Sequence, residues 1–388
     1  MNILMICKSL PGTFKGGIQT HVWKISKWLT KLGYEVHILS GGSLKDREET
    51  VEIDGRIIHK IPFFPGRKLP FIPLFAEEYA FNQAAAKWLN KHANNFEVIH
   101  MQGRSGYLFD WKMKYSKIPI VITLHGLIDV EYSQSNSKGC RSLDHRWHQK
   151  RTKQFEAKQF QRADAMISVS HEMQRLLGEQ YPEYVQKSSI IYNGIDPPNF
   201  PPSKINLDSK TLLFVGRLSS IKGLFPLMEA MQKVRKEIKL VILGDGPDRS
   251  ALEQDIQRKK LQENVILKGA VSMQKVFEWV DRSYALILPS FYETQGIVLM
   301  EANICGRPVL ASNINGINEI VENGKNGILF EKGNVDEIAT SINWLFDHPK
   351  EAKRMGDFGE SHIMKKFAWE IIARKTSALY SKLVVKKQ

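Results

Sequence analysis

Two glutamates, Glu293 and Glu301, are separated by seven residues and carry the first chemical signal in the chain. The apolar run at 284–288 predicts a buried parallel strand that Pro289 ends, and a helix is expected over 296–304. Glu293 then lies in the loop at the carboxyl end of a strand, and Glu301 lies in the helix that follows. Open α/β sheets bind their ligands in the crevice at this edge. Both carboxylates are therefore candidates for contacts with a ligand.

The loop that joins the two glutamates offers backbone groups. Thr294, Gln295, Gly296 and Ile297 lie at the expected start of the helix, where backbone N–H groups have no partner within the helix. Such groups, together with the helix dipole, favour an anion. The loop is thus predicted to hold an anionic part of the ligand.

A pair of cations follows another expected strand. Residues 211–215 are apolar, and Arg217 and Lys222 come after them in a loop that contains glycine. Both side chains can reach the crevice at the carboxyl end of that strand. Two fixed cations suit the phosphate groups of an anionic ligand, because charge-assisted hydrogen bonds to phosphate are strong. The pair predicts a phosphate clamp that works without a metal ion.

Glycines follow two more strands. Gly16 and Gly17 lie between the first expected strand and a helix, so they let the backbone approach a diphosphate closely. Gly244 opens a Gly-Asp-Gly run after the expected strand at 239–243. Neither run completes the Gly-x-Gly-x-x-Gly of a dinucleotide-binding fold, and no acidic ribose ligand stands out. A nicotinamide-dependent oxidoreductase is therefore disfavoured.

Apolar strands alternate with helical periodicity along nearly the whole chain, which is the pattern of parallel α/β sheets. We expect strands at residues 2–7, 35–39, 97–101, 119–124, 164–169, 188–192, 211–215, 239–243, 264–268, 284–288 and 308–311. We expect helices at residues 18–31, 75–92, 143–161, 171–179, 223–236, 248–260, 272–282, 297–304, 335–346 and 350–383.

The length of 388 residues exceeds one typical core and suggests two domains. Four of the six residues at 197–202 are proline, which suits neither a helix nor a central strand, so this run is the expected linker. The first domain is expected over residues 1–200 and the second over residues 204–368.

Composition excludes several classes of protein. The net charge of +14 is spread over both halves, without the concentrated patch of a nucleic-acid-binding protein. Anionic substrates or an anionic membrane surface explain the balance equally well. No apolar run is long enough to span a bilayer. Cys7, Cys140 and Cys305 are too far apart in sequence for a metal motif or a disulfide framework, so a cytoplasmic protein is expected.

The Glu-x7-Glu element, from Pro289 to Ala302, and the stretch Gly216-Arg217-Leu218 with Lys222-Gly223 resemble retaining glycosyltransferases of family 4. That family has the GT-B fold, in which two Rossmann-like, doubly wound α/β domains face each other across a cleft. The resemblance covers nearly the full length and is strongest from residue 211 to residue 330. It implies that a C-terminal helix at about 369–388 packs back on the first domain.

The resemblance also implies roles for the residues singled out above. Glu293 would face the donor sugar, and Glu301 would bind the ribose hydroxyls of the nucleotide. Arg217 and Lys222 would hold the diphosphate. The pair Gly16 and Gly17 would cover the donor phosphates from the N-terminal side, as does a Gly-Gly pair in the family.

Three further residues gain a role only from the resemblance. His125, at the end of the expected strand 119–124, would point at the donor sugar near the reaction centre, although an isolated histidine is more often structural. Gly244 would form a wall of the nucleotide pocket, and Lys268 would lie in the loop that lines the base. The sequence departs from the family at Thr294 and Gln295, where Glu-Gly-Phe-Gly is usual. These two side chains leave the identity of the donor sugar open.

The acceptor site is expected in the first half, where the resemblance is weakest. Residues 61–73 are apolar, aromatic and basic, and either contact a lipid-linked acceptor or a membrane, or pack on their own domain. Residues 138–162 are strongly basic with helical periodicity, and a solvated face is the simpler interpretation.

The sequence thus predicts a metal-independent retaining hexosyltransferase without a cofactor, acting in polysaccharide or glycoconjugate biosynthesis. Its donor would be a nucleotide sugar, with a UDP-sugar favoured and a GDP-sugar possible, and its acceptor a hydroxyl of a glycan or lipid-linked glycan. Peripheral binding to the inner face of the membrane stays open. The alternatives are a nucleotide-sugar epimerase of the same architecture and a non-enzymatic basic protein that binds anions or membranes.

Overall fold

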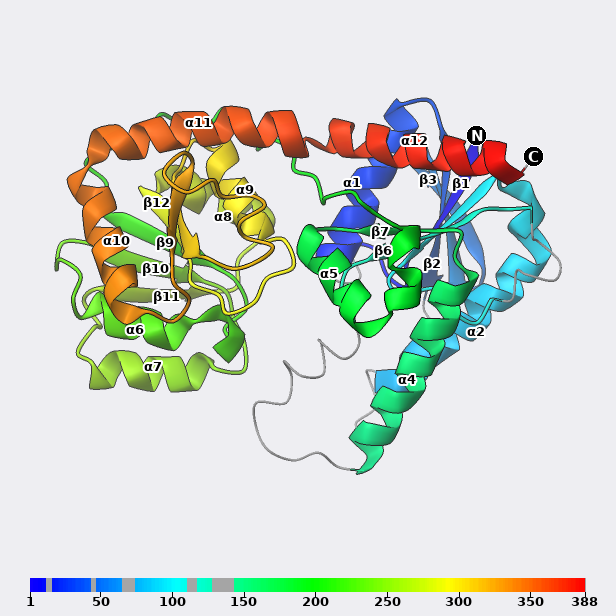
Figure 1. Cartoon of the computed structure of the whole chain (residues 1–388), viewed down its shortest axis with the longest axis horizontal. Coiled ribbons are helices and arrows are strands. Elements are labelled where there is room, and N and C mark those ends of the chain that lie inside the picture. The colour runs from blue at the N-terminus through cyan, green and yellow to red at the C-terminus, as the bar shows by residue number, and fades with distance from the viewer. Residues whose placement is uncertain (12–15, 43–46, 65–73, 110–116, 128–142, 388) are drawn as a thin grey trace. The chain divides into compact units, whose positions relative to one another are not determined.

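The computed structural model describes residues 1–11, 16–42, 47–64, 74–109, 117–127 and 143–387. They form two compact units, each built on its own sheet (Figure 1). Unit 1 comprises Met1–Gly194 and Trp369–Gln388, and unit 2 comprises Ile195–Ala368.

Unit 1 contains an eight-stranded sheet in the order β3-β4-β2-β1-β5-β6-β7-β8. Neighbouring strands are parallel except β3 and β4, which are antiparallel. The strands are β1 (Asn2–Ile6), β2 (Glu35–Gly42), β3 (Glu49–Ile53), β4 (Arg56–Pro62), β5 (Val98–Gln102), β6 (Ile120–Leu124), β7 (Ala165–Ser168) and β8 (Ser188–Ile190). Strands β5 and β6 are buried along their whole length, as expected of parallel strands covered on both faces.

The helices of unit 1 come from both ends of the chain. They are α1 (Gly17–Lys31), α2 (Leu74–His92), α4 (Leu143–Arg162), α5 (His171–Gln180) and α12 (Trp369–Lys387). Helix α12 lies beside α1 (Figure 1). Trp369, Ile372 and Tyr380 of α12 belong to the same buried apolar cluster as Ile3 of β1. The Tyr380 hydroxyl also lies 2.5 Å from Nδ1 of His100 in β5, so a buried hydrogen bond adds to this packing.

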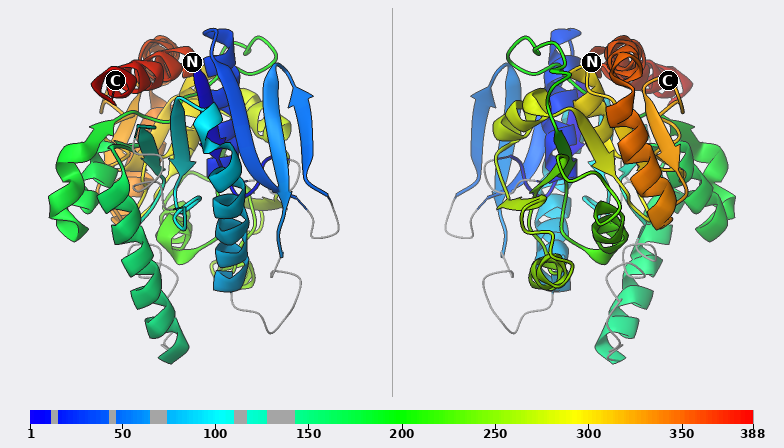
Figure 2. Two further views of the ribbon diagram at one scale, coloured as in Figure 1. Left: turned by 90° about the vertical axis from the view of Figure 1, so that its right-hand side faces the viewer. Right: turned by 90° about the vertical axis from the view of Figure 1, so that its left-hand side faces the viewer.

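The hairpin of β3 and β4 has no counterpart among the predicted strands. Figure 2 shows it in blue at the edge of the sheet. Strand β3 is mostly exposed, so it carries no apolar run that would reveal it. Asp54 and Gly55 form its turn with φ values of 50° and 71°, the conformation that favours Asp-Gly between two strands. The apolar and basic stretch at 61–73 begins in β4, and residues 65–73 lie outside the described residues.

Unit 2 contains a six-stranded parallel sheet in the order β11-β10-β9-β12-β13-β14. The strands are β9 (Thr211–Val215), β10 (Lys239–Leu243), β11 (Val265–Gly269), β12 (Ala285–Leu288), β13 (Val309–Ser312) and β14 (Gly327–Phe330). The helices are α6 (Leu224–Met231), α7 (Arg249–Arg258), α8 (Met273–Arg282), α9 (Ile297–Ile304), α10 (Val335–Asp347) and α11 (Pro349–Phe367). The edge strand β14 is short, begins with glycine and was not among the expected strands.

Each sheet has one point at which the strand order reverses. In unit 1, β2 and β5 lie on opposite sides of β1, and in unit 2, β10 and β12 lie on opposite sides of β9. Both units are therefore Rossmann-like, doubly wound α/β folds. Ligands bind such sheets at the carboxyl ends of the strands that flank the reversal. The expected ligand-binding edges thus lie at β1 with β5 and at β9 with β12.

The chain leaves unit 2 for the last time at Ala368. Residues 350–383, expected as one helix, form α11 and α12, and Ala368 between them has φ −56° and ψ 138°. A parallel bridge joins Ala368 to Ile195, and the Ile195 N–H donates to the Phe367 carbonyl oxygen at 2.9 Å. This pairing replaces the helical hydrogen bonds that a continuous helix would make.

The proline-rich run at 197–202 lies inside unit 2, a few residues past the division at Gly194 and Ile195. Ser203 fixes the end of the run, because its N–H donates to Asp281 at 2.8 Å and its carbonyl oxygen accepts from the buried Arg307 at 3.0 Å. The run is thus anchored to unit 2 at both ends.

Changing Tyr380 to Phe should loosen α12. The substitution leaves the buried His100 without its Nδ1 partner, which costs about 1–3 kcal/mol. Hydrogen exchange of the α12 amides should become faster, since local opening reports local stability. Tyr284→Phe is the matched control, because it removes a buried tyrosine hydrogen bond to Leu345 in unit 2. Equal protection of α12 in the wild type and Tyr380→Phe would show that apolar packing alone holds this helix.

Candidate functional site

The predicted clamp and the first glutamate meet where the sheet of unit 2 reverses. Arg217 and Lys222 follow β9, with Lys222 ending a short 3₁₀ helix (Ser220–Lys222), and Glu293 follows β12. Lys222 Nζ donates to Glu293 Oε1 at 2.5 Å, and Ser290 Oγ donates to the same oxygen at 2.9 Å. The side chains of Lys222 and Glu293 are 21% and 13% exposed, so water screens the pair only in part.

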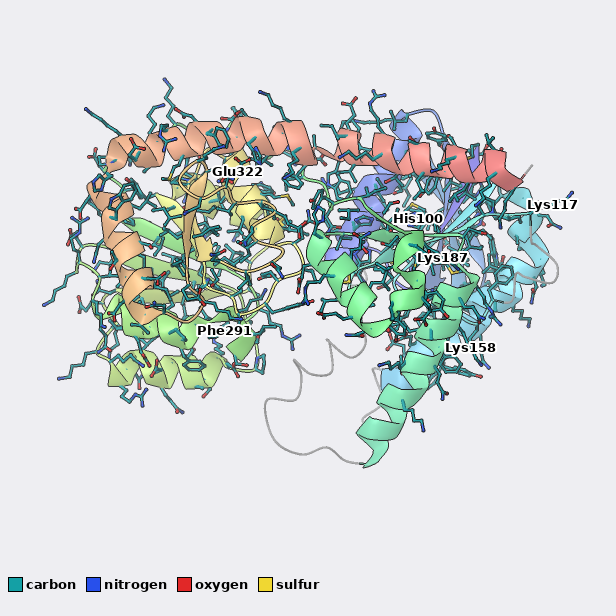
Figure 3. The ribbon with its side chains drawn as sticks, viewed as in Figure 1. His100, Lys117, Lys158, Lys187, Phe291 and Glu322 are labelled. Carbon is teal, nitrogen blue, oxygen red and sulfur yellow. The ribbon has the colours of Figure 1, made fainter. Side chains whose placement is uncertain are left out.

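Close approach of the two loops makes this contact possible. The N–H of Phe291, an exposed residue labelled in Figure 3, donates to the Ile221 carbonyl oxygen at 2.8 Å. Gly223 has φ 67°, and a Cβ there would lie 1.9 Å from the Pro289 carbonyl oxygen. Only glycine fits at this position, because any side chain would push the loops apart.

Arg217 presents its charge differently from Lys222. It is exposed, and among the described residues no hydrogen bond or ion pair engages its guanidinium. A guanidinium offers several N–H donors in a fixed plane, which suits the oxygens of a phosphate. Arg217 is thus a cation available to an anionic ligand, whereas Lys222 already has a carboxylate partner.

Glu301 lies on α9 and is only 7% exposed. Burial raises the pKa of its carboxyl group from 4.5 to about 7. No hydrogen bond or ion pair to Glu301 occurs within the described part of the chain. A buried carboxylate without donors is unfavourable, so this position suits a ligand that brings hydroxyl groups.

The loop between the glutamates is tightly constrained. Gly296 precedes α9 with φ 55°, and Gln295 is almost fully buried. Gly316 has φ 82°, and a Cβ there would lie 2.4 Å from the Glu293 carbonyl oxygen. The segment around Gly316 therefore packs directly on the backbone that carries Glu293. Thr294 and Ile297 of the same loop stay partly exposed.

Gly244 and Lys268 take different positions. Gly244 has φ 142°, and a Cβ there would lie 1.8 Å from the Gly216 carbonyl oxygen, so glycine lets the loops after β10 and β9 touch. Lys268 lies within the edge strand β11, with Nζ 5.8 Å from the centre of the Trp279 ring. No contact described for Lys268 joins it to the pair of Lys222 and Glu293.

In unit 1, Gly16 and Gly17 lie at the start of α1. Gly16 is the extended residue before the helix, with φ −153°, and Gly17 is the first helical residue. A Cβ on Gly17 would meet nothing within 4 Å. The backbone here is thus open to an approaching group. Residues 12–15 of the same loop lie outside the described residues.

His125 follows β6 and is held by two neighbours. Its Nε2 lies 3.0 Å from Gln102 Oε1, and its ring meets the His21 ring edge-on with centroids 4.8 Å apart. Burial, followed by the nearby His21 and His100, lowers the pKa of His125 well below its usual value. His125 is therefore neutral at neutral pH. Figure 3 shows His100 among the strands of unit 1.

Sequence reasoning did not identify His21, Gln102 or Ser290 as site residues. Ser290 lies three residues before Glu293 and is fully buried. Gln102 ends a strand that is otherwise apolar except for His100, and polar residues in a buried strand are a usable signal. His21 gave no signal, since its neighbours Asn193 and Trp369 are remote in sequence.

The described residues contain neither a metal-binding cluster nor a membrane-spanning helix. No group of three or more His, Cys, Asp or Glu side chains there is placed to hold a metal ion. Among the helices described, none combines the length and apolar character that crossing a bilayer requires.

Two family profiles match the chain in succession. The family described as Glycosyltransferase Family 4 matches residues 15–198, and the family described as Glycosyl transferases group 1 matches residues 196–362. The boundary between the matches falls close to the division between the two units.

Similar proteins span the whole chain. Alpha-maltose-1-phosphate synthase of Mycolicibacterium smegmatis is 25% identical, over 99% of this chain and 100% of that protein. The 2-deoxystreptamine N-acetyl-D-glucosaminyltransferase of Niallia circulans is 25% identical, over 94% and 97%.

Solved structures share the fold. Sucrose-phosphate synthase from Thermosynechococcus elongatus superposes with a TM-score of 0.81 at 20% identity, covering 99% of each chain. Anabaena Alr3699/HepE, solved in complex with UDP-glucose, gives a TM-score of 0.73 at 20% identity, covering 98% of this chain and 100% of that one. The two profiles, which together span residues 15–362, and the two doubly wound units show that the chain belongs to the family 4, or group 1, glycosyltransferases and has the GT-B fold.

Proposed function

We propose that the chain is a retaining hexosyltransferase that uses a nucleotide-diphosphate sugar and needs no metal ion. The observation that carries the proposal is the contact of Lys222 with Glu293 at the reversal of the unit 2 sheet. It brings a lysine and a carboxylate side by side, and in this proposal the lysine serves the phosphate and the carboxylate serves a sugar hydroxyl. The buried Glu301 on the helix that follows supplies a second carboxylate without donors of its own.

Each residue has a distinct task in this proposal. Arg217 and Lys222 hold the diphosphate, and the backbone around Gly296 and at Gly16 and Gly17 adds N–H donors. Glu301 accepts hydrogen bonds from the two ribose hydroxyls. Glu293 accepts from a hydroxyl of the transferred hexose. Thr294 and Gln295 lie beside that sugar.

The reaction follows from where charge develops. The bond between the anomeric carbon and the phosphate oxygen breaks, and both bonding electrons stay on the phosphate. Arg217 and Lys222 stabilise this growing charge as preorganised cations. The hydroxyl of the acceptor approaches on the same face and gives its proton to the leaving phosphate. Its oxygen bonds to the anomeric carbon, so the configuration is retained.

The comparisons support a UDP-sugar as donor and a glycan as acceptor. One similar structure contains UDP-glucose, while another, a starch synthase catalytic domain from Arabidopsis thaliana, contains ADP and acarbose. A GDP-sugar stays within the proposal, because no described contact selects a base. The net charge of +14 also supports peripheral association with an anionic membrane.

A donor screen tests the proposal directly. UDP-, GDP- and ADP-sugars are each added to the chain, and the thermal midpoint and release of the nucleoside diphosphate are measured. A donor should raise the midpoint, since it binds only the folded state. Release should continue in excess EDTA. Loss of activity in EDTA with rescue by Mn²⁺ would overturn the metal-free clamp, and isomerised nucleotide sugar as sole product would indicate an epimerase.

Glu301→Gln should weaken nucleotide binding and stabilise the protein at alkaline pH. The carboxyl pKa is about 7 in the folded state and 4.5 when unperturbed. Its stability contribution is thus fully present below pH 4.5 and is lost as pH rises through 7, by about 3 kcal/mol. Glutamine never ionises, so the thermal midpoint of the variant should exceed that of the wild type at pH 8 and approach it below pH 4.5.

The nucleotide affinity of Glu301→Gln should fall at the alkaline pH at which its thermal stability rises. Glu301→Gln should bind UDP about ten- to a hundredfold more weakly at pH 8, because hydrogen bonds to a charged acceptor are lost. Isothermal titration calorimetry measures the UDP affinity of both proteins. The phosphates of UDP also change protonation with pH, and the variant corrects for that effect because it lacks the Glu301 carboxyl group. Equal UDP affinity in both proteins would exclude Glu301 as the ribose ligand.

Glu293→Gln should separate binding from transfer. Glu293 competes with the diphosphate for Lys222, so a neutral amide should raise UDP affinity about threefold to tenfold for a pair of this exposure. Affinity for UMP, which lacks the second phosphate, should not change. Transfer should fall about a hundredfold or more. Ser290→Ala, which keeps the carboxylate, serves as the control. Weaker UDP binding in Glu293→Gln would contradict the competition.

A further inference from the structure

A ladder of polar side chains crosses the interior of unit 1. Strands β5 and β6 are parallel neighbours, with Gln102 opposite Thr123. His100 Nε2 lies 2.7 Å from Thr123 Oγ1, and one step further along the strands Gln102 Oε1 lies 3.0 Å from His125 Nε2. His100, Gln102 and Thr123 are all at most 1% exposed. The ladder therefore brings hydrogen-bonding groups to the carboxyl end of the sheet through an otherwise apolar core.

We propose that Gln102 is a positioning residue that fixes His125 with its proton on Nε2, so that Nδ1 accepts a hydrogen bond from a hydroxyl of the transferred sugar. The reason is chemical. A carboxamide oxygen can only accept, so the imidazole nitrogen that faces Gln102 Oε1 must carry the hydrogen. The other nitrogen of a neutral imidazole is then an acceptor. The inference rests on the proposed function, from which it takes the hexosyl donor as the molecule that supplies the hydroxyl.

Among the described residues, the other half of the Gln102 carboxamide makes no hydrogen bond that competes with the one to His125. Gln102 Nε2 is buried and has no hydrogen-bond partner, so the bond to His125 is the one interaction described for its amide group. An apolar residue would avoid a buried, unpaired donor at this position. A glutamine here is thus explained by what its oxygen does for His125.

His21 fixes the orientation of the same ring. It meets His125 edge-on, and its own Nδ1 donates to Asn193 Oδ1 at 2.7 Å. Trp369 meets the His21 ring from another side, with centroids 5.3 Å apart. His21 is 6% exposed and therefore has little freedom to rotate. His125 is consequently held by a hydrogen bond on one side and by a fixed aromatic edge on another.

The surroundings keep all these rings uncharged. The titratable groups described around His125 are His21 from α1 and His100 from β5. Burial lowers the pKa of His21 to about 4, and burial with His21 lowers that of His100 to about 3. A neutral His125 cannot act as an acid at neutral pH. Its lowered pKa also makes it a weak base, so the proposed role is to accept a hydrogen bond from a hydroxyl.

The tautomer can be read without any activity. In protein labelled with ¹⁵N-imidazole histidine, the signals of His125 are assigned by their loss in His125→Asn. We expect Nε2 protonated and Nδ1 bare from pH 6 to pH 9. Adding UDP-glucose should shift the Nδ1 signal, whereas UDP, which lacks the sugar, should not. A protonated Nδ1, or an Nδ1 signal unchanged in protein saturated with UDP-glucose, overturns the proposal.

Two variants and a control separate positioning from stability. Gln102→Leu should lower transfer about tenfold, the scale of one hydrogen bond, with a mixture of His125 tautomers and unchanged UDP affinity. Gln102→Glu should place a carboxylate beside the ring, protonate it and depress transfer near pH 6. Glu301 ionises in both proteins, so its effect on the rate is removed by dividing the Gln102→Glu rate by the wild-type rate. This ratio should rise with pH.

Gln159→Leu is the matched control. It removes another buried amide, which donates to the Gly103 carbonyl oxygen at 3.1 Å and has no described contact with His125. Its rate and His125 signals should equal those of the wild type. Equal loss of transfer in Gln159→Leu and Gln102→Leu, with a single Nε2–H tautomer in both, would mean that Gln102 acts only through stability. A wild type that shows the expected tautomer but transfers no sugar would refute the proposed function and leave the assignment of the tautomer intact.

Discussion

The site of unit 2 depends on the contact between Lys222 and Glu293, and that contact depends on a backbone approach that side chains would prevent. Gly223 touches the carbonyl of Pro289, and Gly316 touches the backbone of Glu293. These glycines bring the loops after β9 and β12 together where the sheet reverses. Lys222 Nζ then donates a hydrogen bond of 2.5 Å to Glu293 Oε1. In the proposed function an incoming diphosphate therefore meets a cation that is already held at this edge, and it competes with Glu293 for that cation.

One buried polar residue in each unit has a group without a hydrogen-bond partner among the described residues. Glu301 is buried with a raised pKa, and Gln102 has an unpaired amide nitrogen. Each costs stability. In the proposals above, Glu301 is satisfied by hydroxyl groups of the ligand, whereas Gln102 acts through His125. Structural polar residues behave differently, since the buried Arg307 is surrounded by acceptors from Ser203, Asp281 and Cys305. The hydrogen bonds that surround Arg307 thus compensate its burial and mark it as a structural residue.

The parallel strands that form the centre of each sheet could be predicted from sequence, because strands buried on both faces are continuous apolar runs. The hairpin of β3 and β4 could not be found in this way, since β3 is exposed, although Asp54-Gly55 marked its turn. The break at Ala368 has no local signal at all. No proline or glycine interrupts the helical pattern there, and the bridge to Ile195 decides the conformation. Tertiary pairing overrides local propensity at that residue.

The same division applies to the site. Lys222 and Glu293 could be brought together from sequence, because the ends of neighbouring parallel strands meet at one edge. The environment of His125 could not, because His21 contacts it from a remote segment and is itself held by Asn193 and Trp369 from two others. What sequence did contain was His100 and Gln102 alternating within an apolar strand. Alternation puts both side chains on one face, so a buried polar pair at the carboxyl end of β5 implies a polar partner on β6. His125 is that partner, which makes Gln102 a predictable residue once the strand order is known.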